Sequence, residues 1–269
     1  MNNMKLYTKM FHLHVIISIH TLGVFYLTCP SIASITTFIY GGCSQLKYNP
    51  GTTIYESIVN SVLTSLVNSA SNANFNNFKI SLPGSTQSDI VYGLFQCRGD
   101  LSNSDCRDCV SNAVSQVGTL CIYTVGGALQ LDGCFVKYDN ISFLGAEDKA
   151  IVMHKCGPSS SGGDPDTLTR RDAVLTYLSA EGLYFRVGGS GKIQGVAQCT
   201  QDLSVGECQD CLSEAIGHLK SECESSPWGD MFLAKCYARY SERGFSSSSG
   251  KRLRHHGWWW SIISGFFVI

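Results

Sequence analysis

Charged side chains are scarce in this chain. Only 15% of its 269 residues are Asp, Glu, Lys or Arg, and the formal net charge is -1. The basic residues concentrate toward the two ends, while the central part of the chain is mildly acidic. A nucleic-acid-binding surface needs clustered positive charge, so this composition gives no electrostatic basis for a nucleic-acid partner.

Histidines are few in the part of the chain where a catalytic or metal site would have to lie. Of the 7 histidines, only His154 and His218 fall outside the terminal segments, and they do not occupy equivalent positions. Nucleophilic catalysis requires a nucleophile with a general base beside it. No such set of residues is repeated between the two copies. We therefore expect no catalytic residues, no metal ligands and no cofactor.

The N-terminal segment 1–34 has the features of a secretory signal peptide. Lys5 and Lys9 form a positively charged region before a largely apolar run from Phe11 to Tyr26. Ser31-Ile32-Ala33 then has the small-x-small pattern of a signal-peptidase site. An uncleaved membrane anchor is the alternative interpretation. We expect cleavage near this site.

Export determines how the 13 cysteines are interpreted. Cys29 lies inside the predicted signal peptide, so an even number remains in the mature chain. In an oxidising compartment such cysteines indicate a disulfide framework rather than metal sites or reactive thiols. The even number fits complete pairing.

Ten of these cysteines form an internal repeat with an offset of 102 residues. Each copy has the spacing C-x8-C-x2-C-x11-C-x12-C, and Gly93 and Gln96 return in register as Gly195 and Gln198. One further cysteine precedes each copy, which gives two sets of six. The first set is Cys43, Cys97, Cys106, Cys109, Cys121 and Cys134, and the second is Cys156, Cys199, Cys208, Cys211, Cys223 and Cys236.

Secondary-structure patterns recur with the cysteines. Apolar residues at helical spacing predict the helices Tyr55–Ser69, Ser104–Val117, Arg171–Ala180 and Val205–Leu219. Extended patterns predict the strands Asp89–Cys97, Ala128–Tyr138, Lys192–Cys199 and Met231–Tyr240. Helices and strands in this mixed order predict an α+β fold, with two tandem domains in which helices pack on an antiparallel sheet.

The domain boundaries follow from composition and from the repeat. We predict a first domain at 35–156 and a second at 157–244, with the Gly-, Pro- and Ser-rich stretch 157–163 as the connection. A Ser-rich and basic linker at 245–257 then leads to the hydrophobic segment 258–269. This segment is shorter than the about 20 residues that span a bilayer. It is interpreted as a shortened transmembrane helix, an interfacial aromatic anchor or a lipid-anchor signal, and these alternatives stay open.

The two C-x-x-C pairs have a spacing that also occurs in redox and zinc sites. The pattern around Cys106 and Cys109 is helical and does not follow a strand as in a thioredoxin-like site. No histidines repeat at spacings that would complete a zinc site beside them or beside Cys208 and Cys211. Structural disulfides are therefore the favoured interpretation.

One N-glycosylation sequon is present at Asn140-Ile141-Ser142. Secretion would expose it to the glycosylation machinery. We therefore predict that Asn140 carries a glycan.

The doubled cysteine spacing resembles the plant stress-antifungal domain typified by the ginkgo-nut antifungal protein. Tyr40-Gly41-Gly42-Cys43-Ser44 and Gln130-Leu131-Asp132-Gly133-Cys134-Phe135 are similar to the plasmodesmata-located proteins, and cysteine-rich repeat secretory proteins share the tandem. The resemblance covers residues 38–244. It implies two helices on a five-stranded antiparallel sheet in each domain. The disulfides it implies are Cys43–Cys121, Cys97–Cys106, Cys109–Cys134, Cys156–Cys223, Cys199–Cys208 and Cys211–Cys236.

The resemblance also points to a set of ligand positions. The ginkgo protein binds mannose through an asparagine, an arginine and a glutamate. The corresponding positions are Ser44, Ala128 and Asp139 in the first copy, and lie near Gly157, Asp230 and Ser241 in the second. Neither copy retains the set, which argues against mannose binding and against antifungal lectin activity.

The resemblance implies a non-enzymatic cell-surface protein at plasmodesmata, which modulates cell-to-cell trafficking, defence or viral movement through its tandem ectodomain. The alternative is a soluble apoplastic carbohydrate-binding or antifungal protein, and a third hypothesis is a redox enzyme using the C-x-x-C pairs. The expected partners are other ectodomains, cell-wall carbohydrate and viral movement proteins. The plasma membrane is a further expected contact, through the C-terminus.

Overall fold

The computed structural model describes residues 35–50, 53–83, 89–159, 165–180 and 182–243. The predicted signal peptide at 1–34, the linker at 245–257 and the hydrophobic segment at 258–269 lie outside these described residues. Within the described ranges, no helix is both long enough and apolar enough to cross a membrane.

The first domain is a five-stranded antiparallel sheet with two helices on one face. In chain order its elements are β1 (Phe38–Cys43), α3 (Thr53–Ser69), β2 (Phe75–Ile80), β3 (Val91–Cys97), α4 (Asn103–Leu120), β4 (Gly127–Leu131) and β5 (Cys134–Asp139). The strands lie in the order β1-β4-β5-β3-β2. The predicted α+β class is confirmed.

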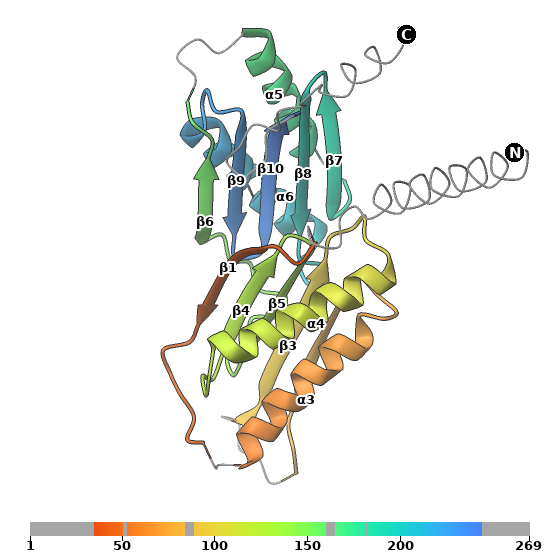
Figure 1. Cartoon of the computed structure of the whole chain (residues 1–269), viewed down its shortest axis with the longest axis vertical. Coiled ribbons are helices and arrows are strands. Elements are labelled where there is room, and N and C mark those ends of the chain that lie inside the picture. The colour runs from red at the N-terminus through yellow and green to blue at the C-terminus, as the bar shows by residue number, and fades with distance from the viewer. Residues whose placement is uncertain (1–34, 51–52, 84–88, 160–164, 181, 244–269) are drawn as a thin grey trace, which may run out of the picture.

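The second domain repeats this topology. Its elements are β6 (Ile151–Cys156), α5 (Pro165–Leu178), β7 (Phe185–Ser190), β8 (Ile193–Cys199), α6 (Val205–Glu222), β9 (Trp228–Leu233) and β10 (Cys236–Glu242), with strand order β6-β9-β10-β8-β7. Figure 1 shows the two sheets arranged end to end. In that view α3 and α4 lie in front of the first sheet, whereas α6 lies behind the strands of the second.

The cysteine-bearing helices begin at local capping signals. Ser102 precedes α4, and its side-chain oxygen accepts a hydrogen bond from the backbone N–H of Asp105. Ser204 and Glu207 form a reciprocal capping box at the start of α6. Such caps satisfy N–H groups that have no partner within the helix. They place the first cysteine of each C-x-x-C pair in the first turns of a helix.

Two predicted strands are in fact hairpins. The single strand predicted for Ala128–Tyr138 is divided into β4 and β5 by a turn at Asp132-Gly133. Met231–Tyr240 is divided in the same way into β9 and β10. In the first copy, Asp-Gly between two apolar runs is a strong turn signal. The apolar alternation continues on both sides of the turn and so concealed it.

The domain boundary lies earlier than predicted. Ile151–Cys156 is β6, which pairs with β9 as an edge strand of the second sheet. The connection between the sheets is therefore the segment 140–150, whereas the stretch 157–163 follows β6 inside the second domain. The prediction placed Cys156 in the first domain because glycine and proline after it were interpreted as a linker. In the fold, β6 has the same place as β1 in the first copy.

The core of each domain lies between the sheet and its helices. On α3, Ile58, Val62 and Leu66 are fully buried. A Cβ atom at Gly93 of β3 would lie 2.3 Å from Cγ1 of Val62, and the equivalent Gly195 has Cγ1 of Val174 at 2.7 Å. Both repeated glycines therefore allow a helix to approach the sheet closely.

Candidate functional site

Six disulfides connect the helices, strands and loops of the two domains. They join the pairs that the resemblance implies, namely Cys43–Cys121, Cys97–Cys106, Cys109–Cys134, Cys156–Cys223, Cys199–Cys208 and Cys211–Cys236. The two cysteines of each C-x-x-C pair are bonded to different strands rather than to each other. Among the described residues, no group of three or more potential metal-binding side chains is placed to hold an ion.

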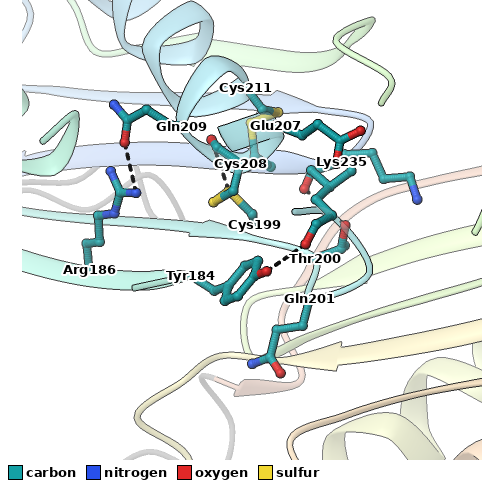
Figure 2. The surroundings of a disulfide bond; sticks show 12 residues. Tyr184, Arg186, Cys199, Thr200, Gln201, Glu207, Cys208, Gln209, Cys211 and Lys235 are labelled. Atoms are coloured by element: carbon teal, nitrogen blue, oxygen red, sulfur yellow. Dashed lines mark hydrogen bonds between the residues drawn. A yellow bond between two sulfur atoms is a disulfide. The ribbon is translucent and has the colours of Figure 1, made fainter. Parts of the chain in front are cut away.

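The surroundings of Cys199–Cys208 illustrate how these bonds are enclosed (Figure 2). Arg186 of β7 donates a hydrogen bond to Oε1 of Gln209 at 3.2 Å, and Figure 2 shows this pair on one side of the disulfide. Burial of Arg186 lowers the pKa of its guanidinium. Both sulfur-bearing residues are at most 1% exposed, so this disulfide is shielded from solvent.

The two domains meet end to end, through strand ends and through side chains on the helix-free faces of their sheets. At the centre of the contact, the ring of Tyr40 from the first domain lies edge-on to Phe232 from the second, with centroids 5.7 Å apart. Phe135 flanks Tyr40, and Tyr237 stacks on Phe232 at 5.1 Å. Burial raises the pKa of both tyrosine hydroxyls. This aromatic centre resembles the buried middle of a protein–protein interface.

Repeated glutamines hold the backbones of the two domains together. Nε2 of Gln198 donates a hydrogen bond to the carbonyl of Cys97 at 2.9 Å. The backbone N–H of Gln201 donates to Oε1 of Gln96 at 3.0 Å. Gln96 and Gln198 are equivalent in the repeat, and each is at most 5% exposed. Because buried amides need partners, these residues favour one relative position of the domains.

Four charged residues form a network across the same interface, which we call the interdomain charge network: Arg98 and Asp132 of the first domain, and Asp230 and Arg239 of the second. Asp132 accepts a hydrogen bond from Nη1 of Arg98 at 2.6 Å and from Nη1 of Arg239 at 2.7 Å. Nε of Arg239 also donates to Asp230 at 2.8 Å. Burial alone would lower the pKa of Arg239, but the carboxylates of Asp230 and Asp132 raise it above its ordinary value.

The segment between the sheets is itself attached to the second domain. The ammonium of Lys235 donates to the carbonyl of Phe143 at 2.8 Å and forms an ion pair with Asp202. The backbone N–H of Gly145 donates to the same carboxylate at 3.0 Å. The ammonium of Lys137 lies 4.5 Å from the centre of the Phe143 ring. This connection is therefore an ordered part of the interface rather than a free linker.

The interface residues were not found from the sequence, although a signal for them is present. Arg98 is equivalent to Thr200 in the repeat, and Asp132 is equivalent to Ala234. Charged residues that occur in only one of two otherwise matching copies indicate contacts that the copies do not share.

The three first-copy ligand positions are close in space. Ser44, Ala128 and Asp139 line one hollow of about 300 Å³ on the outer face of β1, β4 and β5. Ala128 contributes no donor there, and Asp139 is shorter than the glutamate of the ginkgo protein. The hollow can accept hydrogen bonds through Asp139, but it lacks an arginine at the expected position. Lys137 also lines it, and burial lowers the pKa of that ammonium.

The second-copy positions belong to a different hollow, which we call the interdomain cleft. Asp230 and Ser241 line it, whereas Gly157 is not among its lining residues. The cleft measures about 300 Å³ and is lined by both domains, with Arg98, Asp100, Phe185, Val187, Gln194 and Val196 among its walls. It therefore combines apolar side chains with hydrogen-bonding groups, as small-ligand sites do.

The predicted glycosylation site lies directly after β5. Oδ1 of Asn140 is buried and has no hydrogen-bond partner in the described part of the chain. The neighbouring Ile141 is 68% exposed. Glycosylation of Asn140 stays a prediction.

The family comparison matches both domains. The salt stress response/antifungal family matches residues 42–141 and 155–243. The second match begins within β6, in agreement with the boundary seen in the fold. Plasmodesmata-located protein 7 of Arabidopsis thaliana is 59% identical over 234 residues, which cover 84% of this chain and 77% of that protein.

Two solved structures have the same architecture. The tandem DUF26 ectodomain of the Arabidopsis thaliana cysteine-rich receptor-like protein PDLP5 matches with a TM-score of 0.72 and 45% identity, covering 77% of this chain and 99% of that one. The corresponding ectodomain of PDLP8 matches with a TM-score of 0.73 and 43% identity, covering 78% of this chain and 100% of that one. The likeness thus extends over two domains in tandem.

Proposed function

This chain belongs to the salt stress response/antifungal family, and from that premise we propose that it is a non-enzymatic cell-surface protein of plasmodesmata. In this role it modulates cell-to-cell trafficking, in defence or in viral movement, through its tandem ectodomain. The observation that carries the proposal is the 59% identity to plasmodesmata-located protein 7, which spans both domains. The proposed partners are other ectodomains, cell-wall carbohydrate or viral movement proteins, with the plasma membrane contacted through the C-terminus.

The structure contributes a surface on which such recognition could take place. The interdomain cleft exists only when the two domains hold their observed relation, because Arg98 and Asp100 reach it from the first domain. The remaining walls come from the second sheet. The interdomain charge network, together with Gln96 and Gln198, preorganises the cleft, and preorganisation lowers the entropy lost on binding.

Localisation is tested by imaging the full chain with a fluorescent tag inserted after Arg243. Plasmolysis separates wall, membrane and apoplast, and a callose stain marks plasmodesmata. We expect punctate fluorescence that coincides with callose. Diffuse apoplastic fluorescence would contradict the proposal and would favour a soluble carbohydrate-binding or antifungal protein instead.

The role of the cleft is tested with the double variant Val187→Asp/Gln194→Ala. Val187 is 58% exposed and Gln194 is also exposed, so we expect the variant to fold and to reach plasmodesmata. A charge in place of the apolar wall should remove most of the effect of overexpression on movement of a cytosolic fluorescent protein between cells. The measurement is the number of neighbouring cells that the reporter enters.

The matched control is Val205→Asp, which introduces the same charge at a position of 57% exposure on α6. This variant should alter reporter movement as strongly as the wild type does. A cleft variant that retains the full wild-type effect would remove the cleft from the proposal and leave the localisation untouched.

A further inference from the structure

Three tyrosine rings lie in contact where two distant segments of the first domain run side by side. The ring of Tyr48 is 5.1 Å from that of Tyr55 and 5.9 Å from that of Tyr123, measured between centroids. The backbone N–H of Tyr48 donates to the carbonyl of Tyr123 at 2.9 Å, so the main chain itself holds these two residues together. We call the three residues the tyrosine cluster.

The members of the tyrosine cluster differ in their exposure to solvent. Tyr123 is 42% exposed, Tyr48 is half-buried and Tyr55 is only 6% exposed. The hydroxyl of Tyr55 also donates to the carbonyl of Val125 at 2.9 Å, which keeps this ring in the core. A reagent in solution therefore reaches Tyr123 first and Tyr48 next, while Tyr55 is shielded.

The backbone presents Tyr123 in an unusual conformation. Its φ is 59°, in the left-handed region that is unfavourable for tyrosine, and no other non-glycine residue in the described ranges has a positive φ. Backbone strain of this kind is concentrated at functional sites. At the equivalent position the second domain carries Ser225, so the fold itself does not require an aromatic ring here.

We propose that Tyr48 and Tyr123 form an oxidative cross-linking site, at which hydrogen peroxide and a haem peroxidase join the two rings by a carbon–carbon bond. Two phenols that are already neighbours react at a high effective concentration, which favours coupling within one chain over coupling between chains. This modification goes beyond the proposed function, and it depends neither on the interdomain cleft nor on localisation.

The reaction is a two-electron oxidation of a pair of phenols. Each tyrosine gives one electron and its hydroxyl proton to the oxidised peroxidase and becomes a phenoxyl radical. The two radicals combine through the ring carbons next to the hydroxyl-bearing carbons. Each of these carbons then loses its hydrogen as a proton while the phenolic oxygen regains one. In total the protein loses two hydrogen atoms, and one hydrogen peroxide becomes two waters.

The new bond would join the segment 44–48 to the loop that follows α4. The Cys43–Cys121 disulfide closes nearly the same loop, so the cross-link adds little to the stability of the disulfide-bonded fold. Its distinct effect appears under reducing conditions, because thiols break a disulfide but not a carbon–carbon bond. The two segments then stay joined.

The test treats the dilute full chain with a haem peroxidase and hydrogen peroxide, and reduces all disulfides before digestion. Mass spectrometry should find the peptides that contain Tyr48 and Tyr123 joined, with a mass lower by two hydrogen atoms. The joined fraction should not change with protein concentration, because the reaction occurs within one chain. Tyr123→Phe and Tyr48→Phe each keep the ring and remove the hydroxyl, so either should lower the joined fraction roughly tenfold or more.

Tyr177 provides the matched control. It is 61% exposed on α5, and its ring lies beside Gly188 rather than beside another tyrosine. Tyr177→Phe should therefore leave the joined fraction unchanged. No cross-link in the wild type, coupling only between chains, a cross-link that persists in Tyr48→Phe, or an equal loss with Tyr177→Phe would overturn the proposal.

Discussion

Replacing Cys43 and Cys121 together with alanine should lower the free energy of unfolding of the first domain by about 4 kcal/mol. The disulfide joins residues 78 positions apart and attaches β1 to the end of α4. Without it, the unfolded chain regains the conformational freedom of a long open loop, and this favours unfolding. Chemical denaturation of the oxidised proteins, followed by fluorescence, measures the difference.

The equivalent bond of the second domain provides the matched comparison. Cys156 and Cys223 are separated by 67 positions, so their joint replacement with alanine should cost a similar amount. The loss should affect the transition of the second domain. A change below about 1 kcal/mol in both variants would show that these loops remain constrained in the unfolded chain, contrary to the prediction.

Replacing Asp132 with alanine should destabilise the contact between the domains by about 3 kcal/mol. Asp132 receives hydrogen bonds from arginines of both domains, and its side chain is only 18% exposed. Without this carboxylate, the partly buried guanidinium groups of Arg98 and Arg239 lose the partner that they share. Calorimetry should then show the unfolding transitions of the two domains moving apart.

Asp100 supplies the control for this experiment. It also pairs with Arg98, at 2.7 Å, but its side chain is 51% exposed. Solvent screens such a pair, so Asp100→Ala should change stability by less than about 1 kcal/mol. If Asp132→Ala left the two transitions together and unshifted, the charge network would not couple the domains.

The helices were the most predictable elements of the fold. Tyr55–Ser69 and Val205–Leu219 were placed within a few residues of α3 and α6, because apolar periodicity is a pattern that one or two turns of chain already show. The short edge strands β1, β2, β6 and β7 were not predicted. Each gains most of its definition from a neighbouring strand far away in sequence, and such pairing leaves a weak local pattern.

The residues of the candidate site were harder to predict from the sequence than the elements of the fold. The first-copy positions Ser44, Ala128 and Asp139 were identified by resemblance, and they line one hollow. The second-copy positions were only partly brought together, since Asp230 and Ser241 line a cleft that the first domain completes. No local pattern around Asp230 indicates that Arg98 and Asp100 will form the opposite wall.

Two like domains, two sets of six cysteines and two amphipathic helices in each domain could all be inferred from the sequence alone. Cysteine spacing and apolar periodicity are patterns along the chain, so they are visible in the sequence. How the two domains face each other became evident from the three-dimensional structure. Asp132 and Arg239 are 107 residues apart, and they meet because the β4–β5 turn at the end of the first sheet lies against β10 of the second. That orientation depends on the shape and charge of two complete surfaces, which exist only after each domain has folded.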